Sequence, residues 1–120
     1  MQELISILKN QRQLLEQLLH CTKEEQQALI NRSLKQIETF CKQKDRLQLE
    51  LHELEEKRVL QTGGRTVTEL ARINRMPQLL PYADHLKSLL RQLQAVQTTN
   101  MLLVRNELAY WKQFKAAFFP

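Results

Sequence analysis

The chain has 120 residues, which is enough for one folded domain, and it carries a net charge of +5. It contains only two glycines and three prolines, so turns are few, and its abundance of Leu and Gln favours helices over strands. No run of about 18 apolar residues occurs, which excludes a membrane-spanning helix at the level of the sequence.

The surplus of positive charge lies in the C-terminal third, where five basic side chains follow Tyr82 against two acidic ones. These charges are scattered rather than clustered, so we interpret them as a solubilising surface in preference to a patch for an acidic partner. Met1 is followed by Gln-Glu-Leu rather than by a basic segment and an apolar core, so we expect no secretory signal. The two cysteines then suggest a reducing, cytoplasmic location.

Residues 2–30 are predicted to form the first long helix, because apolar side chains recur three and four positions apart. A capping-box pattern at Thr22 and Glu25 offers an alternative helix start, but the apolar stripe passes through it without a change of phase. The stripe consists of Leu4, Leu8, Leu15, Leu18, Thr22 and Leu29, with Gln11 and Glu25 as polar members.

A second long helix is predicted over residues 33–61. Ser33 and Gln36 form a capping-box pattern that favours a break at Asn31 and Arg32. Because no Gly or Pro occurs here, one continuous helix to about residue 60 is an open alternative. The stripe of this helix comprises Leu34, Ile37, Phe40, Leu47, Leu51 and Leu54, together with Lys44 and Arg58.

Two glycines in the segment 61–66 give the clearest turn of the sequence. Thr66 and Glu69 form another capping box, which predicts a short helix over residues 67–75. Pro77 should end this helix, since proline disfavours the helical conformation in the residue before it.

The last helix is predicted over residues 82–118. Each long helix carries one apolar stripe, so none is stable alone and the stripes must be buried together. We therefore predict an all-α fold and a single domain over residues 1–120. Three long helices and one short one should form an elongated antiparallel bundle with coiled-coil-like packing.

Catalytic and metal-binding patterns are missing from the sequence. His20, His52 and His85 fall on three different predicted helices without HExxH spacing, and no Gly-rich phosphate loop occurs. We therefore expect no enzyme, no catalytic residue and no cofactor. Cys21, Cys41 and His20 supply only three metal ligands, so we expect no metal site and two small buried thiols. Whether the two cysteines face each other stays open.

Five of the seven aromatic residues lie in the last eleven positions. Trp111, Phe114 and Phe118 share a helical face with the Leu/Val stripe, so we interpret them as core or partner-facing anchors. This argues against nucleic acid as a partner, because a basic stripe with interleaved aromatics is only thinly developed, and two lysines are few for binding a membrane surface. Gln97 and Asn100 interrupt the stripe, either as a register-setting polar pair or as part of a binding site.

Two segments resemble the flagellar export chaperones of the FlgN type. Residues 37–58 contain a lysine, a ladder of leucines and a closing Leu-Glu-Glu-Lys-Arg, close to the Leu-Glu-x-x-x-Arg of that family. Residues 86–108 contain Gln97-Thr-Thr-Asn100-Met-Leu-Leu, where the family typically has Asn-x-x-Asn, often followed by Gly. Here Gln97 replaces the first Asn and Met101 the Gly. The similarity of helix plan covers nearly the whole chain.

The resemblance implies a cytoplasmic chaperone that binds unassembled hook–filament junction proteins, also called hook-associated proteins. It would keep their terminal segments from associating prematurely and deliver them to the flagellar export apparatus. A disordered client segment would become helical in an apolar groove, and the C-terminal helical region is the family's substrate-binding part. The residues implied for client binding are Leu93, Val96, Gln97, Asn100, Leu103, Val104, Leu108, Trp111, Phe114 and Phe118.

Two other classes of function are compatible with the residues. A structural coiled-coil adaptor would form a stable homo-oligomer through the last helix and carry no export substrate. A nucleic-acid binder, the weaker alternative, would show an affinity that falls steeply with salt. The sequence leaves open which flagellar subunit is the client, whether the protein is a monomer or a homodimer, and whether the last helix detaches on binding.

Overall fold

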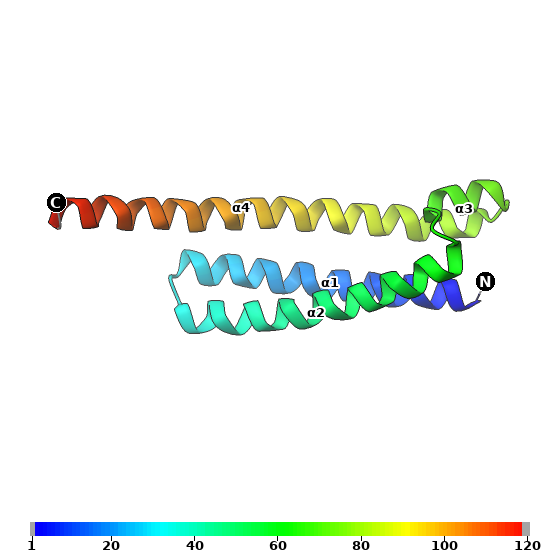
Figure 1. The fold of residues 1–120 in the computed structure, drawn as a ribbon, viewed down its shortest axis with the longest axis horizontal. Coiled ribbons are helices and arrows are strands. Elements are labelled where there is room, and N and C mark those ends of the chain that lie inside the picture. The colour runs from blue at the N-terminus through cyan, green and yellow to red at the C-terminus, as the bar shows by residue number, and fades with distance from the viewer. Residues whose placement is uncertain (1, 119–120) are drawn as a thin grey trace.

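A computed structural model gives the fold of the chain (Figure 1). It describes residues 2–118, without the side chains of Tyr110, Trp111, Phe114 and Phe118. The predicted all-α bundle of three long helices and one short one is confirmed, and its extents of 66 × 22 × 20 Å make it elongated. Within residues 2–118, no helix combines the length and the apolarity needed to cross a membrane. The elements are α1 (Gln2–Ile30), α2 (Leu34–Thr62), α3 (Val67–Ile73), the 3-10 turn η1 (Pro77–Leu79) and α4 (Leu80–Phe118).

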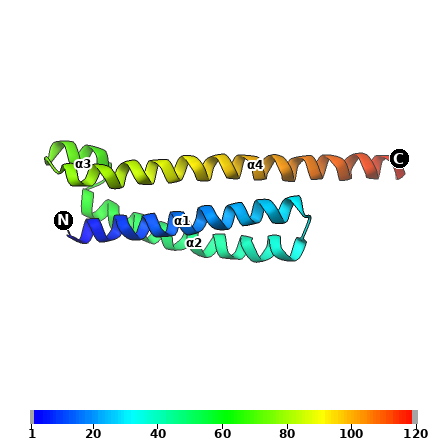
Figure 2. The same cartoon turned by 180° about the vertical axis from the view of Figure 1, so that it is seen from behind.

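The long helix α1 lies between the other two (Figures 1 and 2). It packs against both α2 and α4, whereas α2 and α4 pack far less extensively against each other. Successive long helices run in opposite directions, so α1 and α4 are parallel. Both views show α4 continuing well past the α1–α2 turn, so its C-terminal end extends beyond the helices that accompany the rest of it.

The sequence left open whether one continuous helix or two helices lead to about residue 60. The structure has two helices, α1 and α2, joined by a turn. Arg32 has a left-handed backbone with φ 55°, and the Ser33 amide donates to the carbonyl of Ala28 at 3.0 Å. This is the six-residue hydrogen bond of a Schellman C-cap, formed here without glycine. The predicted capping box at Ser33 is wrong, because Ser33 is the N-cap of α2 but its side chain makes no capping hydrogen bond.

The predicted capping box of the short helix α3 is present. The Glu69 amide donates to Thr66 Oγ1 at 3.1 Å, and the Thr66 amide donates to Glu69 Oε2 at 3.5 Å. The helix ends at Ile73, two residues earlier than predicted. It ends there because Arg75 adopts a left-handed backbone with φ 53° and the Met76 amide donates a hydrogen bond to the carbonyl oxygen of Ala71 at 2.8 Å. The last helix begins at Leu80, after the turn η1, rather than at residue 82.

Thr66→Ala should destabilise the chain by about 1 kcal/mol, since it removes the acceptor for the free Glu69 amide in the first turn of a seven-residue helix. Thr66→Ser is the matched control and should stay close to the wild type, because serine caps as well as threonine. Urea unfolding followed by circular dichroism measures both. Equal stabilities for the alanine and serine variants would contradict a stabilising role of this cap.

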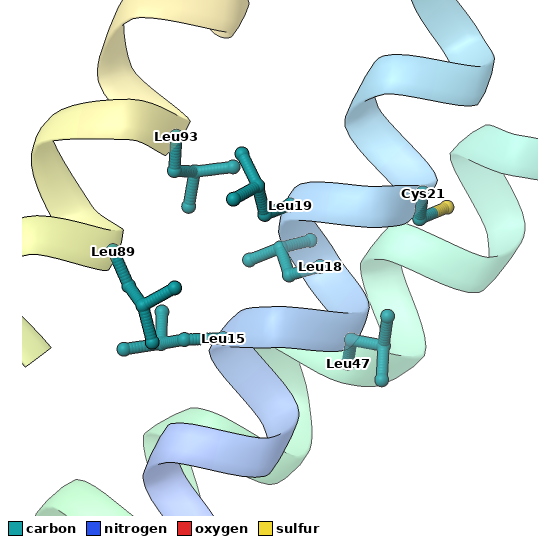
Figure 3. Packing of buried hydrophobic residues seen from close by; sticks show 7 residues of the cluster. All are labelled: Leu15, Leu18, Leu19, Cys21, Leu47, Leu89 and Leu93. Carbon is teal, nitrogen blue, oxygen red and sulfur yellow. The ribbon is translucent and has the colours of Figure 1, made fainter. Parts of the chain in front are cut away.

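The core consists of two clusters along α1. In the central cluster, leucines of α4 and of α1 face each other, while Leu47 of α2 and Cys21 lie on the other side of α1 (Figure 3). The second cluster joins the N-terminal end of α1 to α3 and η1. The members of the central cluster are Leu15, Leu18, Leu19, Cys21, Leu47, Leu89 and Leu93, and those of the second are Leu4, Leu8, Leu70, Ala71 and Leu79.

The two cysteines have different environments. Cys21 is buried, and its Sγ lies 3.5 Å from the carbonyl oxygen of Phe40. Cys41 is exposed, contrary to the prediction of two buried thiols, and its Sγ lies 3.4 Å from Glu25 Oε2. Each thiol thus contacts a different partner across the α1–α2 interface. Among the described residues, no group of three or more His, Cys, Asp or Glu is placed to hold a metal ion.

Candidate functional site: a groove between α2 and α4

Two open cavities lie over α1, with walls formed by α2 and α4. The first, of about 420 Å³, is at the α3 end, and the second, of about 470 Å³, is nearer the α1–α2 turn. The first is lined by Gln11, Leu15, Leu51, Glu55, Arg58, Thr66, Val67, Thr68, Ala83, Leu86, Lys87 and Leu90. The second is lined by Glu25, Leu29, Ile37, Cys41, Lys44, Gln97, Asn100, Met101, Val104, Arg105 and Leu108.

Both cavities open on the same side of the molecule. A helical position returns to nearly the same side every seven residues, and the lining residues follow this repeat from one cavity into the other. On α4, for example, Leu90, Gln97 and Val104 are seven apart, and on α2 so are Lys44, Leu51 and Arg58. We therefore treat the two cavities as one groove, with α1 as its floor.

Large apolar side chains are exposed along the α4 wall of this groove. Leu90 is 51% exposed, Met101 65%, Val104 41% and Leu108 65%. Exposed leucines are common singly, but a row of them in a concave surface is typical of a site that binds another apolar surface. The chain therefore buries only part of the apolar stripe of α4 in its own core.

A buried polar cluster forms the floor of the second cavity. Lys44 Nζ lies 3.1 Å from Glu25 Oε1, and the two side chains are only 16% and 10% exposed. Asn100 Nδ2 donates to the same Glu25 oxygen at 3.1 Å and to the carbonyl oxygen of Thr22 at 3.1 Å. One carboxylate thus links all three long helices, an arrangement of the kind by which buried polar groups set register in coiled coils.

Asn100 leaves one hydrogen bond unmade. Its Nδ2 faces two acceptors, which fixes the orientation of the amide, and its Oδ1 is buried with no hydrogen-bond donor. A buried carbonyl oxygen without a donor typically costs about 1–3 kcal/mol of stability, so Asn100 Oδ1 is a destabilising group at this point of the groove.

The thiol of Cys41 lies at the edge of this cluster. Desolvation of its sulfur, followed by the hydrogen bond to Glu25 and the negative charge of that carboxylate, raises the pKa of Cys41 above its ordinary value. Lys44 acts in the opposite direction but more weakly. Cys41 is therefore a slowly reacting thiol that nevertheless lines the groove and is open to solvent.

A second polar cluster lies in the first cavity. Arg58 binds both carboxylate oxygens of Glu55, with Nε to Oε2 at 2.8 Å, and Gln11 Nε2 donates to Oε2 at 3.0 Å. Arg58 also donates to the carbonyl oxygen of Arg65 at 3.0 Å, which ties α2 to the loop before α3. The hydrogen bond from Arg58, aided by that from Gln11, lowers the pKa of Glu55 against the opposing effect of desolvation.

Glu55→Gln should reduce the loss of stability that the protein undergoes on acidification. Because the folded-state pKa of Glu55 is lowered, its stabilising effect is present above the unfolded pKa of about 4.3 and is lost as the pH falls through the folded pKa. The side chain is 48% exposed, so the effect should stay below about 1 kcal/mol.

Denaturant unfolding at pH 7 and pH 3 measures this difference, with Glu53→Gln on the exposed surface of the same helix as the control. A Glu55→Gln variant that loses as much stability between these pH values as the wild type would contradict the role of the Glu55–Arg58 pair.

The residues predicted to bind a client separate into three groups. Gln97, Asn100, Val104 and Leu108 line the second cavity. Leu93 is buried in the central core cluster, Val96 packs against that cluster, and Leu103 is half-buried, so these three do not line the groove. The side chains of the remaining three predicted residues lie outside the described part of the structure; these are Trp111, Phe114 and Phe118.

The prediction missed most of the groove. On α4 it omitted Met101 and Arg105, and it included no residue of α1, α2 or the first cavity. A signal for some of them existed, because Lys44 and Glu25 stand out as charged members of otherwise apolar stripes. Such residues are placed where two helices meet, but the sequence alone does not say which helices.

An open apolar groove along the central helix of a bundle is the kind of surface on which a partner helix can bind. The chain is a member of the FlgN protein family, whose sequence model matches residues 1–119. The family comprises chaperones of flagellar protein export, which bind flagellar substrate proteins. The chain matches no curated protein and no solved structure at a significant level.

Proposed function

We propose that this chaperone binds unassembled hook-associated proteins in the cytoplasm. It keeps their terminal segments from associating prematurely and delivers them to the flagellar export apparatus. The groove between α2 and α4 is the observation that carries this proposal, since it offers an apolar surface with no occupant from the described chain. A disordered client segment gains helical structure by burying its own apolar face there.

The shape of the groove suits a client helix rather than a small molecule. The cavities open to solvent, the first beside Ala83–Leu90 of α4 and the second beside Gln97–Leu108, so their two outer ends are Ala83 and Leu108. At about 1.5 Å per residue, this segment is about 38 Å long, the length of a client helix of about 25 residues. A helix laid between α2 and α4 would pack against α1 from above and turn the three long helices into a four-helix arrangement.

Release of the client requires no catalysis by the chaperone. Ordering a disordered segment costs about 2–5 kcal/mol of the interaction free energy, so binding is moderate and reversible. We include Trp111, Phe114 and Phe118 in the proposed client site, as residues of α4 that follow Glu107, whose carboxylate pairs with Arg32 at the α1–α2 turn. Large aromatic residues commonly dominate the binding energy of such contacts.

Self-association through the same groove is the second candidate function, in which the protein is a structural adaptor. The exposed apolar row on α4 favours this alternative, because a second copy could cover it. Co-purification separates the two functions. The full chain, co-expressed with each hook-associated protein of its own genome, should retain at least one of them through salt washes. Retention of none, together with a stable homodimer in sedimentation, would support the adaptor.

A further inference from the structure

Charges that line the groove divide into two kinds. Glu25 pairs with Lys44 and Glu55 with Arg58, so these four side chains neutralise each other. Lys87 lines the first cavity and Arg105 the second, and both are exposed. Within the described part of the chain, neither of these two cations pairs with a carboxylate; Lys87 Nζ lies 3.1 Å from the hydroxyl of Thr68. The groove therefore has two uncompensated positive charges, both on α4.

Lys87 and Arg105 lie on the same edge of the groove. They are 18 residues apart on α4, which is about five complete turns and about 27 Å, so their side chains leave the helix in the same direction. Between them, Leu90, Met101 and Val104 supply the apolar wall. The α4 side of the groove thus combines an apolar stripe with a positively charged outer edge.

Building on the client-binding role proposed above, we propose that the groove recognises an amphipathic helix with carboxylates along one edge of its apolar stripe. Two acidic residues about 18 positions apart on that helix would pair with Lys87 and Arg105, while the stripe packs on α1 and α4. Two separated ion pairs fix the direction and the register of the client, which a continuous apolar stripe alone does not do.

Packing of a second copy through its own α4 suits the groove less well. The exposed apolar row of α4 has a basic edge, so an α4 helix from another copy would bring cations against Lys87 and Arg105. Like charges across an interface oppose association. An acidic partner helix relieves the charge imbalance instead of doubling it.

Two designed helical peptides of 24 residues test this proposal on the intact chain. They share one leucine stripe and differ only in two edge positions 18 apart, which are Glu in one peptide and Lys in the other. We expect the wild type to bind the Glu peptide at least about fivefold more tightly at low salt, and Lys87→Glu with Arg105→Glu to reverse this preference. Lys9→Glu with Lys23→Glu changes the net charge equally on exposed positions outside the groove and should leave the preference intact.

The outcomes distinguish this inference from the proposed function. If hook-associated proteins bind but neither peptide responds to the reversal at Lys87 and Arg105, the charge recognition is wrong while the chaperone function stands. If the preference reverses but no hook-associated protein binds, the recognition stands and the proposed clients are wrong. A wild-type dimer that dissociates on the same reversal would assign the groove to a second copy and overturn the inference.

Discussion

Met101→Asp should weaken binding of a hook-associated client by at least about 100-fold, equivalent to about 2.7 kcal/mol. Met101 is 65% exposed on the α4 wall of the groove, where a client's apolar face would cover it. Bringing a carboxylate into that contact forces its desolvation, which Arg105 four residues further on offsets only in part, whereas the free protein keeps it in water. The fold should therefore persist while binding fails.

Leu102→Asp is a closely matched control for this substitution. Leu102 is the next residue of the same helix and is 49% exposed, but it does not line the groove. Both variants replace an exposed apolar residue by the same acid, so helix propensity and net charge change alike. Isothermal titration calorimetry with a terminal segment of the client should separate them. An equal loss of affinity in both variants would remove the groove from the proposed site.

Lys44→Met should destabilise the fold by about 3 kcal/mol. Glu25 is 10% exposed at its side chain, and the substitution takes away its only cationic partner among the described residues. Removing one member of a buried ion pair typically costs about 3–5 kcal/mol, because the other charge is left without compensation. Asn100 and Cys41 still contact the carboxylate, which places the expected loss at the lower end.

The double variant Glu25→Gln with Lys44→Met tests whether that loss comes from the unpaired charge. A glutamine keeps an oxygen for Asn100 Nδ2 and has no charge to compensate, so stability should return to within about 1 kcal/mol of the wild type. Guanidinium unfolding of the three proteins gives the comparison. A double variant as unstable as the single one would mean that Lys44 stabilises through packing and not through its charge.

The long helices could be predicted because each carries a continuous apolar stripe, and stripes are local in sequence. Their ends were harder to predict. Arg32 and Arg75 adopt the left-handed backbone that usually indicates glycine, so no glycine marked the last residue of α1 or of α3. The Ser33 pattern placed the break correctly, although its side chain does not form the expected cap.

The groove could be predicted only in part, because it depends on how the helices are arranged in space. Asn100 and Gln97 were recognisable as polar members of the α4 stripe. The residues that lie across the groove from them depend on the position of α1 between α2 and α4. In this arrangement, the sides of the α2 and α4 stripes that point away from α1 stay uncovered. Glu25 and Lys44 looked like isolated exceptions in the sequence, and the antiparallel α1–α2 pair brings them together.

Protection of Cys41 from alkylation tests most directly whether a client occupies this groove. Cys41 lines the second cavity and is exposed, while Cys21 is buried. Because the pKa of Cys41 is raised, rates with and without client are compared at one fixed pH. Mass spectrometry of the full chain with a saturating terminal segment of a hook-associated protein should show alkylation of Cys41 slowed at least about tenfold. The thiol introduced by Leu102→Cys should react at an unchanged rate. A client that binds fully while Cys41 reacts as fast as in the free protein would contradict the groove as the client site.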